Sequence, residues 1–227
     1  MNKNKMLNIR NLVIFSGLIL VAMFVLSAWA WVQIPADQPV PVHWGINGEP
    51  DRYGSKFEGL LLMPLIYTAV CALLAVVPRI DPRGNNILRS GKAYGALWIA
   101  MMLFFLILHV VLILNTLGIN APVDMVIPIG VGALFVVIGN YMGKVRRNYM
   151  FGIRTPWTLA SELSWNKTHR LGGRLFVLLG LVMIASAAFA TGMVTFVIMF
   201  AGIIGMLIGV FAYSYVVWKQ DPNVQTE

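Results

Sequence analysis

Long apolar runs separated by short polar segments dominate the hydrophobic pattern of this chain. A transmembrane helix needs about 20 mostly apolar residues, and four runs reach or approach this length, at residues 12–32, 60–77, 93–114 and 125–142. A fifth apolar stretch, 175–217, is too long for one helix, and we expect it to break at Ala190-Thr191-Gly192. The runs lack the alternation of β-barrel strands. The pattern therefore predicts an all-α integral membrane protein, a bundle of six transmembrane helices.

Composition supports this fold class and excludes others. Of the 227 residues, 59% are hydrophobic and 11% are charged, and the mean hydropathy is +0.77. Because a soluble domain carries about 25% charged residues, this composition excludes a water-soluble globule, a disordered protein and a nucleic-acid-binding domain. The single cysteine, Cys71, excludes a disulfide framework and a cysteine-based metal cluster.

The basic residues are distributed unevenly between the two sides of the predicted bundle. Of the 17 Lys and Arg residues, Arg52 and Lys56 fall on one side, among the acidic residues of segment 33–58, and the others fall on the opposite side. Lys and Arg accumulate in cytoplasmic loops. We therefore expect both termini in the cytoplasm, segment 33–58 outside and segment 144–174 inside. The basic inner face also favours anionic lipid headgroups.

The N-terminus has two interpretations. Lys3, Lys5 and Arg10, followed by an apolar stretch and Ala28-Trp29-Ala30, resemble a signal peptide with its cleavage site. The apolar run continues through Trp31 and is longer than the usual signal-peptide core. We therefore expect a retained first helix, with cleavage as the alternative.

The predicted outer loop, residues 33–58, is rich in residues that favour extended chain and turns. Prolines at 35, 39 and 41 disfavour helix, and the pairs 47–48 and 53–54 each supply a glycine for a turn. His43, Glu49, Asp51 and Glu58 carry cation-binding groups, but their spacing matches no metal motif. We expect a compact cap that bonds to its own backbone, without metal or cofactor.

The predicted inner loop, residues 144–174, contains an amphipathic segment. Thr155-Pro156 is a favourable helix start, and Gly172-Gly173 is a favourable stop. Between them, Trp and Leu alternate with polar and basic residues, which suits a helix in the headgroup layer. The segment is therefore expected to be an interfacial helix joining two spans, or a docking surface for a cytoplasmic partner.

Few polar residues fall inside the spans. His109 and Asn140 are the intramembrane polar candidates, and an ionisable residue at this depth is by default a hypothesis of function. They motivate the alternative of a small-molecule transporter or channel, although no span contains Asp, Glu, Lys or Arg.

The chain lacks the sequence motifs of metalloproteases, P-loop ATPases and serine hydrolases, so we expect no enzyme. In the last helix, Gly202, Gly205 and Gly209 allow close helix packing.

Both polar loops resemble known sequence signatures. The stretch PVHWGINGEPDRYGSK at 41–56, followed by Pro64, resembles an N-terminal membrane domain of unknown function. The stretch NYMFGIRTPWT at 148–158, followed by WNKTHRLGG at 165–173, resembles the signature of the SdpI family, bacterial membrane immunity and signalling proteins. The resemblance implies two units, 1–78 with the outer loop and 79–227 with the inner loop.

The resemblance implies a multi-pass protein of the bacterial cytoplasmic membrane that binds or neutralises a secreted, membrane-active peptide toxin and signals by sequestering a cytoplasmic repressor. Its partners would be the lipid bilayer, the toxin and the repressor, without direct nucleic acid binding. The expected toxin-facing residues are His43, Trp44, Asn47, Gly48, Asp51, Tyr53 and Lys56. The expected partner-facing residues are Asn148, Gly152, Arg154, Thr155, Pro156, Trp157, Trp165, Thr168, His169 and Arg170.

Overall fold

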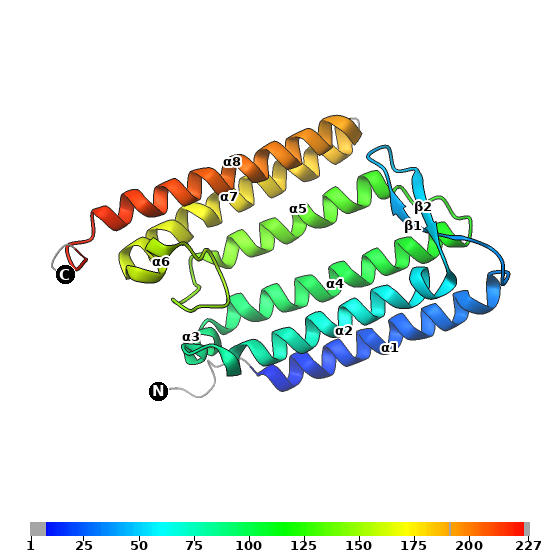
Figure 1. The fold of residues 1–227 in the computed structure, drawn as a ribbon, viewed down its shortest axis with the longest axis horizontal. Coiled ribbons are helices and arrows are strands. Elements are labelled where there is room, and N and C mark those ends of the chain that lie inside the picture. The colour runs from blue at the N-terminus through cyan, green and yellow to red at the C-terminus, as the bar shows by residue number, and fades with distance from the viewer. Residues whose placement is uncertain (1–7, 191, 225–227) are drawn as a thin grey trace.

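Long helices lying side by side form most of the computed structural model, which describes residues 8–190 and 192–224 (Figure 1). Six helices in this part of the chain are long and apolar enough to cross a membrane. They are α1 (Ile9–Gln33), α2 (Lys56–Ile80), α4 (Gly91–Thr116), α5 (Val123–Met142), α7 (Glu162–Phe189) and α8 (Gly192–Lys219). The prediction of six apolar helices is confirmed, and so is the break after Ala190; Thr191 lies outside the described residues.

The shorter elements lie at the two ends of the bundle. The helices α3 (Gly84–Arg89) and α6 (Pro156–Ala160) lie at the end where α1 begins and α8 ends, here called the terminal end (Figure 1). At the opposite end, here called the hairpin end, β1 (Val40–Trp44) pairs antiparallel with β2 (Pro50–Gly54). The expected turn at Asn47-Gly48 is present, with Gly48 at a φ of 76°. The turn expected at Tyr53-Gly54 is wrong, because both residues lie in β2 and pair with β1. The cap predicted as turns is thus a β-hairpin, because the extended proline-rich strand finds a partner across the Asn47-Gly48 turn.

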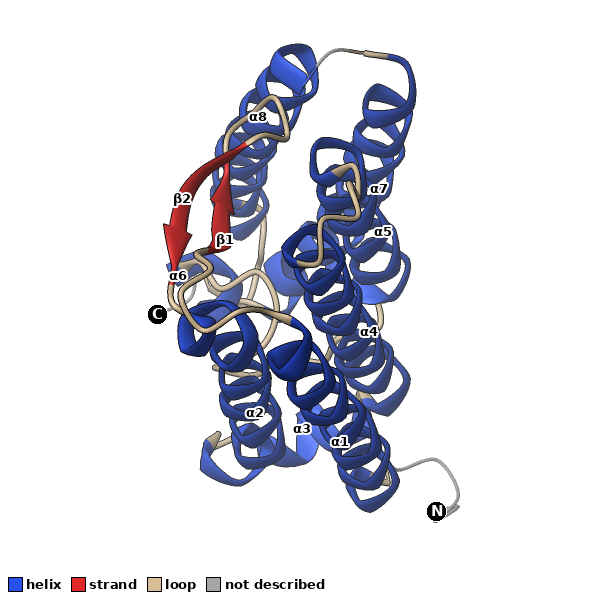
Figure 2. Cartoon of the chain, turned by 90° about the vertical axis from the view of Figure 1, so that its right-hand side faces the viewer, coloured by secondary structure: helices blue, strands red, loops and turns tan. Residues whose placement is uncertain are grey.

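The helices pack in two groups. α1, α2 and α4 contact one another, α7 packs on both α5 and α8, and the contact of α4 with α5 joins the groups. In the first group, Ser16 links all three helices, because its carbonyl accepts from the Tyr67 hydroxyl at 2.9 Å and its hydroxyl accepts from Trp98 Nε1 at 2.9 Å. Viewed from the hairpin end, the hairpin lies between α2 and α8 (Figure 2).

Glycines bring α5 and α7 into close contact, at positions that the sequence did not indicate. A Cβ on Gly139 would lie 2.5 Å from the carbonyl oxygen of Gly173, and a Cβ on Gly132 would lie 2.7 Å from that of Gly180. Close packing was expected instead at the glycines of the last helix. That expectation is wrong for Gly205 and Gly209, since a Cβ on either would meet nothing within 4 Å.

The inner loop differs from the predicted interfacial helix. α6 begins as expected, with Thr155 as N-cap and Pro156 in the first turn, but it ends after five residues. Ser161 is extended and caps a new helix, α7, by accepting from Ser164 N at 2.9 Å. The predicted stop at Gly172-Gly173 is wrong, because α7 continues through both residues. Gly173 is needed for the close approach to α5, and this tertiary contact outweighs its poor helix propensity.

Candidate functional site

Charged side chains project from the hairpin into solvent. His43 Nδ1 and Asp51 Oδ1 lie 2.5 Å apart, and their side chains are 63% and 52% exposed. Arg52 donates to Glu58 at 2.7 Å. An exposed pair of this kind contributes at most about 1 kcal/mol to stability. The hairpin can therefore change its contacts to bind another molecule at little cost.

The turn of the hairpin contacts the bundle, and the chain just after the hairpin is bonded to α1. Lys56, the first residue of α2, donates through Nζ to the carbonyl oxygens of Trp31, at 3.1 Å, and Ile34 at the end of α1. A Cβ on Gly48 would lie 3.0 Å from Asp124, in the first turn of α5. A Cβ on Gly192, the first residue of α8, would lie 2.1 Å from the carbonyl oxygen of Ile46. The hairpin thus contacts the ends of α5 and α8.

The expected toxin-facing residues divide by exposure. His43, Asn47, Asp51 and Tyr53 are exposed, whereas Trp44, Gly48 and Lys56 are half-buried. Three of the four residues considered for a cation are paired, His43 with Asp51 in the hairpin and Glu58, at the start of α2, with Arg52. In the described ranges, no three His, Cys, Asp or Glu side chains come close enough to hold a metal ion.

At the terminal end, the 145–155 loop folds around the buried side chain of Asn148. Its amide nitrogen donates to the carbonyl oxygens of Arg146, at 2.8 Å, and Phe151, at 2.9 Å. Its oxygen accepts from the backbone N–H groups of Met150 and Phe151. One side chain thereby satisfies four backbone groups and fixes the turn, which explains why an asparagine begins the motif.

His169 holds the other half of this loop. Its Nε2 accepts from Ile153 N at 3.0 Å, so the ring proton lies on Nδ1, which donates to the Trp165 carbonyl oxygen at 2.8 Å. Gly152 adopts a φ of 109°, and a Cβ there would lie 2.5 Å from His169 Nε2. Trp165 stacks on the imidazole with ring centroids 4.0 Å apart. The neutral His169 side chain therefore holds the loop in its conformation.

Half of the inner-loop residues expected to face a partner are buried. The buried ones form the internal support of the loop: Asn148, Thr155, Trp165, Thr168 and His169. Those that reach the surface are Gly152, Arg154, Pro156 and Arg170, with Trp157 half-buried. Sequence reasoning missed the supporting residues Asp81 and Asn86, which bond to the backbone of Tyr149 and Arg147. They lie over sixty positions away, and no local pattern signals them.

Hydroxyl groups join the start of α6 and α7 to the end of α8. The Thr155 hydroxyl donates to Ser214 Oγ at 2.9 Å, and the Ser164 hydroxyl donates to the Ser214 carbonyl oxygen at 2.7 Å. Beyond α8, the Ser161 hydroxyl donates to the Asp221 carboxylate. This hydrogen bond and one from the backbone N–H of Asn223 hold the pKa of Asp221 below its ordinary value. The inner loop and α8 are therefore joined by several contacts.

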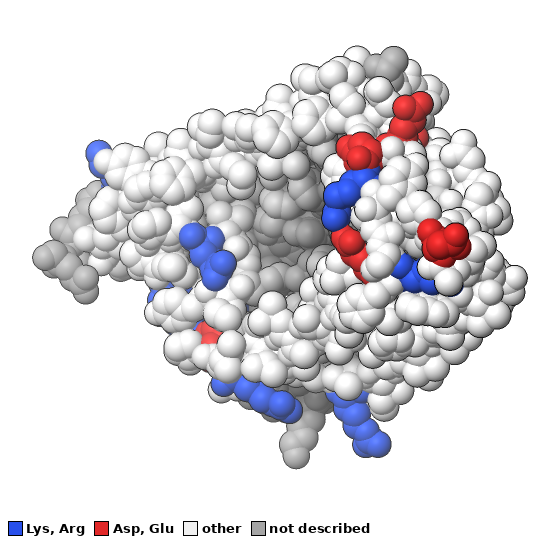
Figure 3. Space-filling model, turned by 45° about the vertical axis from the view of Figure 1, so that its right-hand side comes forward, with Lys and Arg blue, Asp and Glu red and all other residues white. Residues whose placement is uncertain are grey.

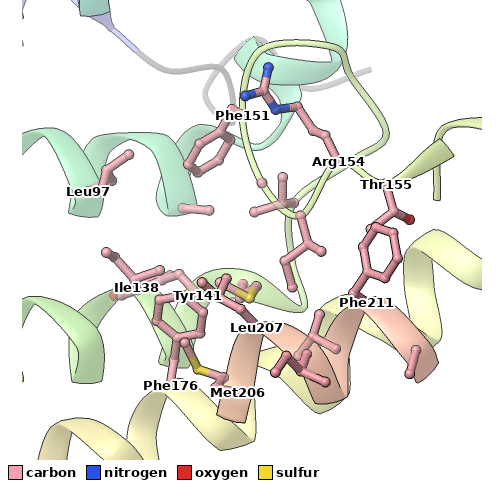
Figure 4. A pocket seen from close by; sticks show the side chains of 18 residues that line it. Leu97, Ile138, Tyr141, Phe151, Arg154, Thr155, Phe176, Met206, Leu207 and Phe211 are labelled. Carbon is pink, nitrogen blue, oxygen red and sulfur yellow. The ribbon is translucent and has the colours of Figure 1, made fainter. Parts of the chain in front are cut away.

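An apolar chamber of about 870 Å³ lies beneath the 145–155 loop. Its walls come from α4, α5, α7 and α8, through residues such as Leu97, Ile138, Phe176 and Leu207 (Figure 4). Ile153 of the loop also lines it. In the space-filling view, one flank of the molecule is hollowed between the charged hairpin and the basic residues toward the terminal end (Figure 3). The sequence did not predict this chamber.

The two intramembrane polar candidates do not meet. His109 is fully buried in α4, and its Nε2 lies 3.1 Å from both Ser27 Oγ and the Met23 carbonyl oxygen. Ser27 itself donates to the Leu60 carbonyl oxygen at 2.7 Å. Asn140 is exposed and lies near the opposite end of the bundle, in the last turn of α5. His109 thus ties α1 to α4, and the two residues form no common polar path.

Comparison with known proteins supports the resemblance of both loops. Residues 144–214 match the SdpI/YfhL protein family, and residues 18–68 match a domain of unknown function, DUF1648. The chain is 27% identical over 210 residues to the immunity protein SdpI of Bacillus subtilis, covering 91% of this chain and 96% of that protein. An uncharacterized protein of Archaeoglobus fulgidus is 38% identical over 48 residues, 21% of this chain and 25% of that protein. No solved structure matches.

These matches agree with the architecture. The DUF1648 match spans the hairpin and parts of α1 and α2, and the SdpI match spans the 145–155 loop, α6, α7 and most of α8. With its six candidate spans, the chain is a multi-pass membrane protein in which residues 144–214 match the SdpI/YfhL protein family and residues 18–68, which precede them, match DUF1648.

Proposed function

We propose that this protein confers immunity to a secreted, membrane-active peptide toxin by binding it at the hairpin. The observation that carries the proposal is the similarity to the Bacillus subtilis immunity protein over 91% of the chain. Binding alone is sufficient for this role, because micromolar affinity requires about −8 kcal/mol and no catalytic group. The exposed hairpin residues His43, Asn47, Asp51 and Tyr53 offer an imidazole, an amide, a carboxylate and a phenol ring for contact.

The orientation that this function requires follows from charge. Two of the 17 basic residues, Lys3 and Lys5, lie outside the described residues, and Arg52 and Lys56 lie at the hairpin end. The other thirteen lie toward the terminal end. Because Lys and Arg accumulate on the cytoplasmic side, we propose that both termini are cytoplasmic and that the hairpin faces outward, with α1 retained as a span.

The terminal end is the proposed contact surface for a cytoplasmic repressor. Its exposed motif residues, Arg154, Pro156 and Arg170, present two cations beside the half-buried Trp157. Signalling needs two states of the bundle with different affinities for the toxin and the repressor. The helix suited to link the two ends is α8, since its first residue contacts the hairpin at Ile46 and its last turns bond to α6 and α7 through Ser214.

We also propose the division of the chain into units 1–78 and 79–227. One family match falls within each unit. α4 belongs to the second unit by sequence but packs on α1 and α2. This packing would make α4 the structural link between the toxin-binding unit and the signalling unit.

Membrane depolarisation tests the immunity function. Cells with and without this protein are challenged with a secreted membrane-active peptide toxin, such as the one counteracted by the Bacillus subtilis relative, and a potential-sensitive dye is followed. Preserved potential only in the expressing cells supports the proposal. Equal depolarisation at confirmed surface expression overturns it for that toxin class. A variant with His43→Ala and Asp51→Ala then tests the hairpin as the binding site.

A further inference from the structure

We infer that the chamber beneath the 145–155 loop binds an acyl chain of an anionic phospholipid, whose headgroup meets Arg154. The inference does not depend on the proposed immunity function, because it rests on the volume, lining and charge of the chamber. It concerns the terminal half of the molecule, whereas the toxin is proposed to bind at the hairpin. A resident lipid would make the 145–155 loop a lipid-binding element.

The lining and the volume define the kind of ligand. The walls are formed almost entirely by aliphatic and aromatic side chains, among them Leu97, Ile138, Phe176 and Leu207. A volume of about 870 Å³ lies within the range of about 300–1,000 Å³ found for sites that enclose small molecules. An apolar site of this size suits a hydrocarbon chain.

The volume also argues against a membrane-spanning peptide. A helix about 10 Å across that rises 1.5 Å per residue fills on the order of 120 Å³ per residue. The chamber of about 870 Å³ therefore holds about seven helical residues, whereas about 20 are needed to cross the bilayer. A slender acyl chain fits this space, and a spanning helix does not.

Charge at the edge selects an anionic headgroup. Arg154 lines the chamber, and its guanidinium extends away from the apolar walls (Figure 4). Its Nη1 donates to the Tyr149 carbonyl oxygen at 2.7 Å. Within residues 8–190 and 192–224, no carboxylate forms an ion pair with Arg154. Arginine binds phosphate through several donors at once, which matches the phosphate of a phospholipid.

The lipid bilayer around the bundle supplies phospholipid to the chamber. α8 packs mainly on α7 and only slightly on α5. One side of the chamber is therefore formed by a helix that makes no extensive contact with α1, α2 or α4. The chamber lies within the span of membrane helices, where lipid chains are the most abundant apolar molecules. Basic residues toward this end attract anionic lipids near the membrane surface.

Photocrosslinking in nanodiscs tests the site. The full-length protein is placed in nanodiscs that contain either phosphatidylglycerol or phosphatidylcholine, each with a diazirine on its acyl chain, and the labelled peptides are identified by mass spectrometry. We expect phosphatidylglycerol to label residues of α5 and α8 that line the chamber, with a preference of about tenfold over phosphatidylcholine. Uniform labelling of all lipid-exposed helices, or equal labelling by both lipids, overturns the inference.

Two variants with matched controls sharpen the result. Ala212→Trp fills the chamber and should abolish the specific label, whereas Ala201→Trp, on the exposed surface of the same helix and outside the chamber, should retain it. Arg154→Gln should remove the headgroup preference, whereas Arg174→Gln, an exposed arginine outside the chamber lining, should keep it. If Ala212→Trp is labelled as strongly as the wild type, the chamber is not the lipid-binding site. If a peptide, rather than a phospholipid, co-purifies in the chamber, the ligand is not a phospholipid.

Discussion

The hydroxyl oxygens of Thr155 and Ser214 lie 2.9 Å apart and join the start of α6 to the C-terminal part of α8, although 59 positions separate them in the chain. Ser214 is also bonded within its own helix, because its hydroxyl donates to the Phe211 carbonyl oxygen at 2.6 Å. Trp157 adds ring contacts to Phe211 and Tyr215, with centroids 4.8 Å and 5.0 Å apart. The loop that roofs the chamber is therefore fixed to the helix that forms its outer wall.

Replacing Thr155 tests this connection. Thr155→Val removes both the N-cap acceptor of α6 and the donor to Ser214, so we expect a loss of about 1–2 kcal/mol in stability. Thermal unfolding in detergent micelles measures it. Thr68→Val is the matched control, because the Thr68 hydroxyl donates only to Pro64 of its own helix. Equal melting temperatures for the two variants would show that the α6–α8 connection does not stabilise the bundle.

Glycine substitutions should separate close from open helix packing. Gly139→Ala forces a methyl group toward the Gly173 carbonyl oxygen, and the overpacking should cost about 1–3 kcal/mol. Gly205→Ala meets open space and should stabilise the helix by up to about 1 kcal/mol through helix propensity. Reversible unfolding of both variants provides the comparison. The α5–α7 contact is looser than described if Gly139→Ala is neutral.

His109 should affect stability without affecting protection. His109→Leu removes the Nε2–H donor shared by Met23 and Ser27, and hydrogen bonds between membrane helices contribute about 0.6–1.7 kcal/mol. We expect a lower melting temperature in micelles, partly restored in His109→Gln, which keeps an amide donor. Protection of cells against the toxin should persist at matched expression. Loss of protection in a stably expressed His109→Leu protein would favour the transport alternative.

The hairpin variant should show the opposite behaviour. His43→Ala with Asp51→Ala removes an exposed pair, so the free energy of unfolding should change by less than about 1 kcal/mol. Protection of the membrane potential should be lost, because these groups belong to the proposed toxin-binding surface. Glu49→Gln, at an exposed position of the same hairpin, serves as the control and should retain protection. If the double variant still protects fully, the toxin binds elsewhere.

Asp221 predicts a pH dependence at the terminal end. The Ser161 hydroxyl lowers the pKa of Asp221 below its ordinary value of 3.8. The stabilisation is thus fully present above pH 3.8 and is lost as the pH falls through the lowered pKa of the folded protein. The melting temperature of the wild type should therefore exceed that of Asp221→Asn at pH 6 and approach it as the pH falls below 3.8. A difference that stays constant down to pH 3 would exclude ionisation of Asp221 as its cause.

Several features were predictable because they depend on short stretches of chain. The length of an apolar run determines whether it can cross the hydrocarbon core, so the six long helices follow from the sequence. The turn at Asn47-Gly48 and the capping of α6 by Thr155 also depend on residues next to one another. The motifs at 41–56 and 148–173 likewise indicated the two segments that match known families, 18–68 and 144–214, before any fold was known.

Tertiary structure decided the features that depend on distant residues. Gly173 reads locally as a helix stop, but in the bundle it allows the backbones of α5 and α7 to touch, and the helix continues. His169 reads as a polar residue available to a partner, yet it is buried and accepts from Ile153 N. The chamber exists because α8 packs on α7 and leaves space beside α4 and α5. The membrane-crossing segments could be predicted from their composition, because hydrocarbon acts on each segment separately. Packing between segments determined which polar residues are buried and where the chamber lies.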